Sequence, residues 1–352
     1  MEASRLPGRK YNIDMLRILA CFMVIVLHVS NSNLHTTDVN SVTWHVLNVY
    51  DSAVRSCVPL FFMISGSVIL DRDNMIPLPM LLRKNTFKLL LLYCVWSWVY
   101  MIDTVGISNL LSAKSLVAIL GAPFNAKYHL WYLPRLAGVY LFSPLLFSLV
   151  KYKSGKYVKY TCAVLVTLGV LVTTVLLFPM SSKAATQIQQ LIPYELCGYV
   201  GYFLVGYFLS KQNFSRFKNW HLVTALLIVI ASAAAIGGAY SVALGKPSDL
   251  LYGYTNLPVF IESVIVFIIF QKRSQIVPGH GEKILLTVSR ATLTIYLLHI
   301  FFLEHLQSWF GLSTRSFNAV LSVPIISIII FIVALLVSLV LLKIPYVNKW
   351  LV

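Results

Sequence analysis

The chain has 352 residues, enough for two soluble domains, but 58% of them are hydrophobic and only 11% are charged, with a mean hydropathy of +0.79. These proportions exclude an ordinary soluble protein and indicate a membrane protein. The formal net charge of +16 first suggests nucleic acid, but no basic stretch combines with an RNA-stacking platform or a groove-reading helix, so no nucleic-acid partner is expected.

Apolar segments long enough to cross a hydrocarbon core of about 30 Å recur along the whole chain. They cover residues 13–32, 54–70, 87–105, 130–150, 160–180, 194–210, 221–243, 255–271, 291–310 and 322–343. The sequence therefore predicts an all-α, polytopic membrane protein with about ten transmembrane helices. No internal repeat, linker or low-complexity tract interrupts the series, so residues 1–352 are expected to form a single membrane-embedded domain.

The positive charges are distributed unevenly between the two sides of this ten-helix arrangement. Of the 28 Lys and Arg residues, 21 fall on the side that carries both termini and 7 on the other. Because cytoplasmic loops are enriched in Lys and Arg, both termini are expected in the cytoplasm. The asymmetry accounts for the net charge, and a basic inner face would also attract anionic membrane lipid or a phosphate-bearing cosubstrate.

The five cysteines each fall alone within or beside an apolar run, without a CxxC pair or metal-ligand spacing. They are interpreted as small core residues, and no metal site is expected.

The first apolar segment contains MLRILACFMVIVLH, which keeps Arg17 and His28 where both are costly in lipid. On an α-helix an 11-residue separation brings two side chains to within about 20° of each other and about 16 Å apart along the axis. Asp14, one turn earlier, can pair with Arg17. Two non-catalytic interpretations stay open. Arg17 can be an interfacial residue that snorkels, and His28 can be hydrogen-bonded by a neighbouring helix.

Three further segments carry polar residues in or near a predicted span. SAVRSCVPLFFMISGSVIL places Arg55 at its outer end, and KYHLWYLPRL gathers His129, Trp131 and Tyr132 at the outer boundary. VSRATLTIYLLHIFFLEH carries Tyr296, His299 and Glu304. The alternatives are that Trp131 and Tyr132 are aromatic-belt residues, and that His299 and Glu304 bond each other across helix turns.

Four motifs in register resemble the acyltransferase-3 family of integral membrane acyltransferases, over nearly the whole chain. They are the Arg-ten residues-His spacing of the first helix, VPLFFMISG, HLWYL, and S-x-x-x-L-x-IY-x-x-H. VTWHVLNVYDSAVRSCVPLFFMISG looks closest to the enterobacterial common antigen O-acetyltransferase group. The chain lacks the C-terminal esterase-like domain of the larger members, so its chemistry is expected within the membrane.

The resemblance implies an O-acetyltransferase of the bacterial inner membrane. Members of the family move an acyl group, usually acetyl, from cytoplasmic acyl-CoA to an envelope glycan or a lipid-linked sugar. The resemblance implies that His28 is the essential catalytic residue and that Arg17 is its partner for the donor. Histidine suits the role of general base, because its ordinary pKa of about 6.5 leaves neutral imidazole near pH 7.

The donor and the acceptor are expected at opposite ends of the first helix. A basic cytoplasmic mouth would hold the phosphates of acetyl-CoA while the pantetheine arm reaches towards His28. Its expected members are Arg17, Asp14 as the partner of Arg17, Arg83, Lys84 and Lys88. The residues expected to orient the acceptor or stabilise the oxyanion are Arg55, His129, Trp131, Tyr132, Tyr296 and His299.

Several alternatives remain at this point. A secondary transporter or flippase for a lipid-linked saccharide would also have many helices and intramembrane charges, although transporters commonly show repeated halves. A structural or sensor protein would have no reason to align Arg17 with His28. Another donor, such as succinyl-CoA, is compatible with the same family. The sequence leaves open whether His28 acts in direct transfer or as an acetylated relay, and it does not identify the acceptor hydroxyl or the oligomeric state.

Overall fold

The computed structural model describes residues 9–106, 109, 112–152, 155–177, 194–273 and 281–350. Within these ranges the chain forms helices and no strand, which confirms the all-α prediction. Eight helical stretches of the described chain are long and apolar enough to cross a membrane. They are Tyr11–Leu34, Val42–Ile69, Leu78–Val105, Tyr128–Tyr152, Gly155–Val175, Asn219–Leu244, Glu282–Phe310 and Ala319–Leu341.

The ten predicted segments all fall on helices. Eight correspond to these long stretches, and the other two form the shorter helices α11 (Tyr194–Ser210) and α13 (Leu257–Gln271). Only the end of the predicted segment 160–180, residues 178–180, lies outside the described residues. Apolar length therefore located the ten apolar helical segments of the described chain.

The second long stretch is broken into two helices, α2 (Val42–Ala53) and α3 (Cys57–Ile69), that follow α1 (Tyr11–Leu34). The hydrophobicity pattern does not predict α2, because it carries polar residues such as Asn48 and Asp51. In the structure these two side chains are buried, with exposed fractions of 2% and 0%. The polar face of α2 is thus turned into the protein.

The remaining helices follow in chain order. The third stretch comprises α4 (Leu78–Met80), the π-helical turn η1 (Leu81–Phe87) and α5 (Lys88–Val105). Then come α6 (Ala113–Leu120), the 3-10 turns η3 (Ala122–Phe124) and η4 (Tyr128–Trp131), α7 (Tyr132–Tyr152), α8 (Gly155–Val166), the π turn η5 (Thr167–Leu171) and α9 (Val172–Val175). After α11 the chain forms α12 (Asn219–Leu244), α13, α14 (Glu282–Phe310), α15 (Ala319–Leu341) and α16 (Pro345–Trp350).

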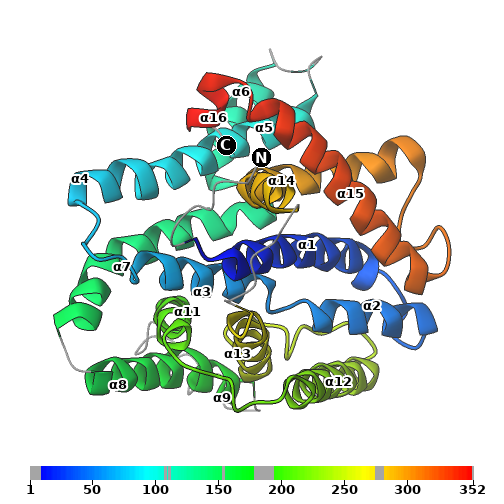
Figure 1. Ribbon diagram of the computed structural model, residues 1–352. Helices are drawn as coiled ribbons and strands as arrows, with labels where there is room; N and C mark the ends of the chain where they lie inside the picture. Colours follow the sequence, from blue (N-terminus) through cyan, green and yellow to red (C-terminus); the bar gives the residue numbers. More distant parts are fainter. Residues whose placement is uncertain are drawn as a thin grey trace.

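Helices α1 and α3 occupy the centre of the molecule and the other helices surround them (Figure 1). The most apolar window of α1 is 67% buried and that of α2 and α3 is 78% buried, against 28% for α12. Helix α1 contacts α2, α3, α13, α14 and α15. Peripheral helices expose large apolar side chains, for example Leu227 and Ile228 of α12, as helices facing lipid do.

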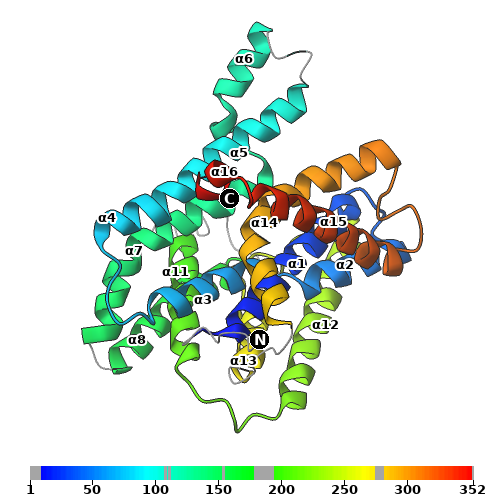
Figure 2. The same ribbon diagram turned by 45° about the horizontal axis from the view of Figure 1, so that its top comes forward.

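The end of α5 and the short helix α6 project from this body (Figure 2). Ser112 caps α6 by accepting a hydrogen bond from the backbone N–H of Ser115 at 3.2 Å.

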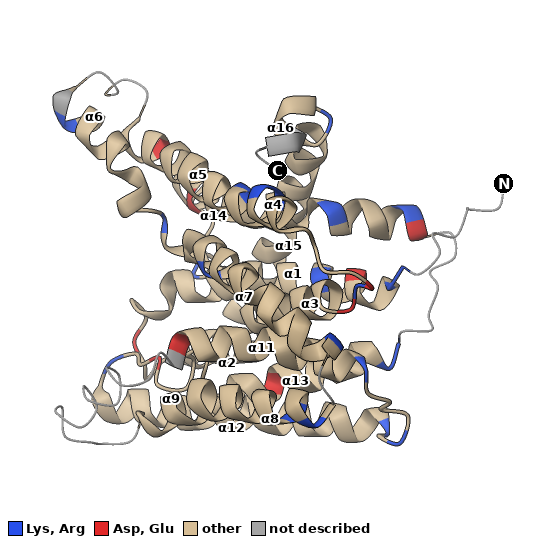
Figure 3. Ribbon diagram, turned by 90° about the vertical axis from the view of Figure 1, so that its left-hand side faces the viewer, with Lys and Arg blue, Asp and Glu red and all other residues tan. Residues whose placement is uncertain are grey.

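Most Lys and Arg residues lie towards the side of the molecule on which the N-terminus lies (Figure 3). Arg5, Lys153 and Lys183, which belong to the charge count made from the sequence, lie outside the described residues. The uneven charge distribution along the chain is therefore also uneven in space. The cytoplasmic location of both termini remains a prediction.

Helices α3 and α11 approach each other more closely than ordinary side chains would allow. A Cβ atom on Gly66 of α3 would lie 1.7 Å from the carbonyl oxygen of Phe203, and a Cβ on Gly206 of α11 would lie 2.1 Å from that of Met63. Small residues allow such backbone contact between membrane helices. These two glycines thus set the distance between α3 and α11.

We predict that Gly66→Ala lowers the free energy of unfolding by about 1–3 kcal/mol or more, because the added methyl group must push α11 away. The measurement is thermal unfolding in detergent. Gly138→Ala on α7 is the matched control, since a Cβ there meets no atom within 4 Å. Equal stability of the two variants would contradict this account of the α3–α11 contact.

Candidate functional site

Helix α1 presents its two unusual polar residues to the same neighbour, α14. Near the start of α1, Nη1 of Arg17 lies 3.4 Å from Oγ of Ser289. Near its other end, the rings of His28 and His299 are 5.1 Å apart between centroids. Arg17 and His28 are eleven residues apart on α1, and Ser289 and His299 are ten residues apart on α14. Packing of the two helices therefore brings Arg17 to Ser289 and His28 to His299.

Asp14 is the common partner of the basic residues around the start of α1. Its carboxylate accepts two hydrogen bonds from Arg9, at 2.9 and 3.1 Å, and one from Ser289 at 2.6 Å. Arg17 donates a longer one at 3.4 Å, which confirms the predicted pairing. Asp14 is 4% exposed, so its negative charge is compensated inside the protein.

A pocket of about 360 Å³ opens beside these residues. It is lined by Arg9, Lys10, Ile13, Asp14, Arg17, Ser67, Val68, Asp71 and Arg72. The lining contains four cationic and two acidic side chains, so it carries a net positive charge. The Arg17 side chain remains 32% exposed, so its guanidinium is available to an anion in this pocket.

Asp71 ties three parts of the chain together at the wall of this pocket. Its carboxylate pairs with Lys10 at 2.5 Å and with Lys211, which follows α11. Partial burial by itself would raise the pKa of the Asp71 carboxyl, but the hydrogen bonds from Lys10 and Lys211 outweigh burial and lower this pKa below its ordinary value. Asp71 is therefore ionised throughout the neutral range and holds both ammonium groups.

His28 lies near the opposite end of α1 and is partly exposed. Its ring contacts the rings of Tyr128, at 5.3 Å, and His299, at 5.1 Å. Among the described residues it has no hydrogen-bond partner. Tyr128 is 54% exposed, so the neighbourhood of His28 is reached from the molecular surface on this side.

His129 and His299 form a buried pair behind His28, with ring centroids 5.2 Å apart. The hydroxyl of Tyr296 donates to the backbone carbonyl of His129, and the backbone carbonyl of Tyr296 accepts from Nδ1 of His299 at 2.5 Å. The exposed fractions of His129 and His299 are 2% and 1%. The structure therefore brings His28, His129, Tyr296 and His299 into one cluster.

Glu304 belongs to the edge of this cluster and is not bonded to His299. Its carboxylate pairs with the ammonium group of Lys127 at 2.7 Å. The alternative in which His299 and Glu304 bond each other across helix turns is therefore wrong. Lys127 also lies 6.0 Å from the ring centroid of Tyr100, whose hydroxyl donates to the carbonyl of Leu297 at 2.7 Å.

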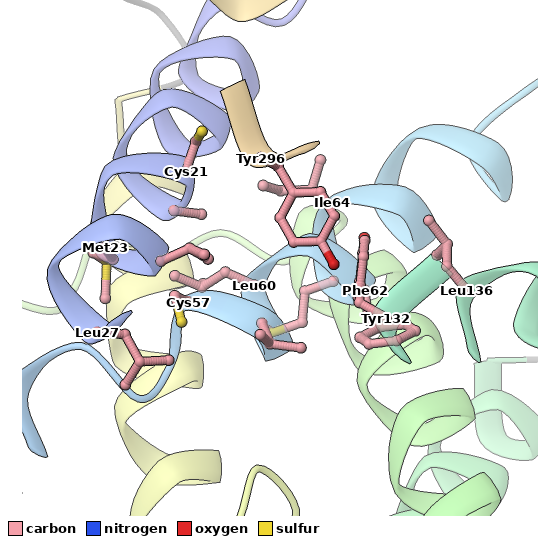
Figure 4. Close-up of a cluster of buried hydrophobic side chains, with 14 of the residues drawn as sticks. Cys21, Met23, Leu27, Cys57, Leu60, Phe62, Ile64, Tyr132, Leu136 and Tyr296 are labelled. Carbon is pink, nitrogen blue, oxygen red and sulfur yellow. The ribbon is translucent and has the colours of Figure 1, made fainter. Parts of the chain in front are cut away.

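Tightly packed side chains lie between the pocket at Arg17 and the cluster at His28. On the face of α1 that links the two residues, Cys21 and Val24 are 1% and 2% exposed. Figure 4 shows Tyr296 reaching between Cys21 of α1 and Ile64 of α3. The lining of the pocket does not include His28, so the two polar ends are separated in this structure.

Arg55 lies in the break between α2 and α3 and is already occupied by protein partners. It donates to Asp51 at 2.9 and 2.5 Å and to the backbone carbonyl of Tyr252 at 3.3 Å. Asn31, one turn after His28, donates to the same Asp51 at 3.3 Å. Arg55 thus connects the end of α1 to the segment after α12, and its side chain is 10% exposed.

The two aromatic residues of HLWYL have different surroundings. Tyr132 is 7% exposed and packs against Phe62 and Tyr296, so it is a core residue in this structure. Trp131 is only partly buried and lies beneath the guanidinium of Arg135, 4.6 Å from the ring centroid. Of the two, only Trp131 has surface that a sugar could contact.

The other basic residues expected at the donor end lie elsewhere. Arg83 and Lys84 are exposed on η1, and Lys88 is partly buried at the start of α5. None of them lines the pocket at Arg17, and η1 packs mainly against α7 and α5.

Sequence reasoning missed three residues of the pocket and one buried carboxylate that belongs to neither group. Arg9, Lys10 and Arg72 line the pocket, but in the sequence they look like ordinary cytoplasmic charges flanking a span. Glu262 of α13 is 3% exposed and accepts from the Ser56 hydroxyl at 2.7 Å. A lone carboxylate within an apolar run was the signal that could have found it.

Comparison with known proteins gives one family. The sequence model of this family, acyltransferase-3, is described as "Acyltransferase domain" and matches residues 10–343. The match includes Arg17, His28, His129 and His299. No curated protein and no solved structure matches the chain.

We predict that Asp71→Asn lowers thermal stability at pH 7 by at most about 1 kcal/mol, because the exposed ion pairs are screened by water. The difference from wild type should stay constant down to about pH 4, the ordinary pKa of an aspartate. It should disappear as the pH falls further, through the lowered pKa of the folded state. Melting curves from pH 7 to pH 3 test this prediction. Asp73→Asn, an exposed neighbour, serves as the control, and a difference that grows on acidification would contradict it.

Proposed function

Because the chain belongs to the acyltransferase-3 family, we propose that it transfers an acetyl group from cytoplasmic acetyl-CoA to a hydroxyl group of an envelope polysaccharide or a lipid-linked sugar. The family match makes it a membrane acyltransferase. The acetyl donor, the roles of His28 and Arg17, the sugar acceptor, the bacterial inner membrane and the kinship with the enterobacterial common antigen O-acetyltransferases belong to the proposal.

The observation that carries the proposal is the placement of two polar sites at opposite ends of α1. One is a positively charged pocket around Arg17, and the other is a partly exposed histidine cluster around His28. Acyl transfer needs an anion-binding site for the coenzyme and a general base for the acceptor hydroxyl. The two sites meet these needs separately.

At the donor end, Arg17 with Arg9, Lys10 and Arg72 would bind the phosphates of the coenzyme. Asp14 holds Arg9 and Arg17 close to each other, so the two guanidinium groups face the pocket together. The phosphates would stay at the pocket while the uncharged pantetheine arm extends along α1. The distance to cover is about 16 Å, the helical rise over eleven residues.

At the acceptor end, His28 would remove the proton of the acceptor hydroxyl as its oxygen attacks the thioester carbonyl. The new C–O bond forms, the C–S bond breaks, and the proton passes from His28 to the departing sulfur of the coenzyme. No proton is gained or lost overall. Tyr128, which contacts His28 and is 54% exposed, offers aromatic surface beside this point for the sugar.

The packed residues between the two ends must move apart for the thioester to reach His28. Cys21, Val24 and Tyr296 fill this space in the structure. A conformational step that opens this packing therefore belongs to the proposed cycle. The shape of the opened space would decide between acetyl and a larger group such as succinyl.

The family match favours an acyltransferase over the transporter hypothesis, and within the described chain no observation favours a transporter. The direct and the relay mechanisms use the same histidine. They differ in kinetics, because a relay predicts ping-pong behaviour and a labelled enzyme.

We predict that His28→Ala lowers acetyl transfer by about 10²–10⁴-fold, the contribution typical of a general base. The measurement is incorporation of labelled acetyl from acetyl-CoA into the glycan fraction of membranes. His221→Ala, an exposed histidine at the start of α12, is the control and should keep its activity. Substantial transfer by the His28 variant would remove His28 from this role.

We predict that Arg17→Ala weakens acetyl-CoA binding by about 10- to 100-fold, the loss of one or two charge-assisted hydrogen bonds. Titration of the purified protein with acetyl-CoA measures the Kd. Lys159→Ala, an exposed lysine on α8, is the control for general surface charge. An unchanged Kd in the Arg17 variant would place the donor elsewhere.

A further inference from the structure

The ring of His299 is held in one tautomer by the backbone of its own helix. Nδ1 lies 2.5 Å from the carbonyl oxygen of Tyr296, and a carbonyl oxygen only accepts hydrogen bonds, so Nδ1 carries the proton. The side chain is 1% exposed, and no described carboxylate is hydrogen-bonded to it, so the ring is neutral. Nε2 of His299 therefore presents a lone pair.

This Nε2 atom is buried and has no hydrogen-bond partner among the described residues. Buried polar atoms are almost always paired, and an exception in a catalytic cluster points to a partner that is engaged only during the reaction. Two other imidazole rings lie beside His299, those of His28 and His129. Of these, only His28 is partly exposed and can meet a substrate.

The His28 ring lies 5.1 Å from the His299 ring and is tilted by 37° to it. The two rings are not hydrogen-bonded in this structure. Among the described residues His28 has no hydrogen-bond partner, so no hydrogen bond has to break for its ring to turn a nitrogen towards Nε2. Hydrogen bonds of catalytic groups are commonly loose in the free enzyme and tighten when substrates bind.

Resting on the proposed role of His28 as general base, we infer that His299 is a positioning residue that accepts a hydrogen bond from His28 through Nε2. This bond leaves the proton of neutral His28 on the nitrogen that faces His299, so the opposite nitrogen is free to take the proton of the acceptor hydroxyl. After that proton transfer, the imidazolium of His28 donates to the same lone pair. His299 itself neither gains nor loses a proton.

The same geometry assigns a role to Tyr296. Its carbonyl fixes the His299 tautomer, and its hydroxyl donates to the backbone carbonyl of His129, so one residue contacts both histidines behind His28. The tautomer of His299 also argues against its expected role as a hydrogen-bond donor to the oxyanion. A bare Nε2 has no hydrogen to donate to a negatively charged oxygen.

The test compares His299→Leu, which removes the lone pair, with His299→Gln, whose amide oxygen can replace it as an acceptor. We expect the Leu variant to lose about 10²-fold or more in kcat, as when the residue orienting a catalytic histidine is altered. The acetyl-CoA Kd should stay within twofold of wild type. The Gln variant should recover at least tenfold over Leu. His305→Leu, on the same helix and facing Asp103, is the matched control and should keep kcat.

Three results would overturn the inference: an unchanged kcat in the Leu variant, equal losses in the Leu and Gln variants, or a loss that appears only in acetyl-CoA binding. Should the Leu variant fail to fold, the wild-type protein answers the same question. Nitrogen NMR of histidine-labelled protein in detergent should show His299 with a protonated Nδ1 and a bare Nε2. A protonated Nε2 would contradict the inference.

Failure of this inference can be distinguished from failure of the proposed function. An active His28→Ala variant would refute the general base itself. An inactive His28→Ala variant together with fully active His299→Leu would leave the base in place and remove only its positioning residue.

Discussion

The high cost of leaving polar and charged groups unpaired in an apolar surrounding governs the arrangement of this protein. Helix α1 carries a guanidinium near one end and an imidazole near the other, and both are turned to α14 and away from lipid. Each needs partners, so Asp14 and Ser289 gather at one end and a set of histidines and tyrosines at the other. The position of α1 at the centre of the bundle follows from this requirement.

The same requirement explains the broken helix pair α2–α3. Asp51 is fully buried, and Arg55, in the break between the helices, donates two hydrogen bonds to its carboxylate. Asn31 joins the same carboxylate from α1. If α2 and α3 formed one continuous helix, the Arg55 side chain would point in a different direction. The irregular backbone is therefore placed where protein groups surround it, as membrane proteins require.

Much of the fold could be predicted from the sequence, because apolar length alone marks a spanning helix. Helix α2 was not predicted by apolar length, because Asn48 and Asp51, which are buried, give its sequence the polarity of a loop. The pairing of Asp14 with Arg17 was readable because it depends on local helical spacing. The neighbours of His28 could not be predicted from the sequence, because the contact between His28 and His299 depends on how α1 packs on α14. Arg83 and Lys84 were expected beside Arg17 because they share its predicted side of the membrane, but sharing a side does not fix which helix a residue packs against.

The close packing of Cys21 and Val24 against the neighbouring helices has a further consequence for a cell that stores energy as an ion gradient. A permanent water-filled bore between the basic pocket and the histidines would let protons flow down that gradient. In this structure buried apolar side chains lie between the two ends of α1, and such layers would insulate one side of a membrane from the other. In the proposed cycle, the packing would therefore have to open for the thioester and close around it.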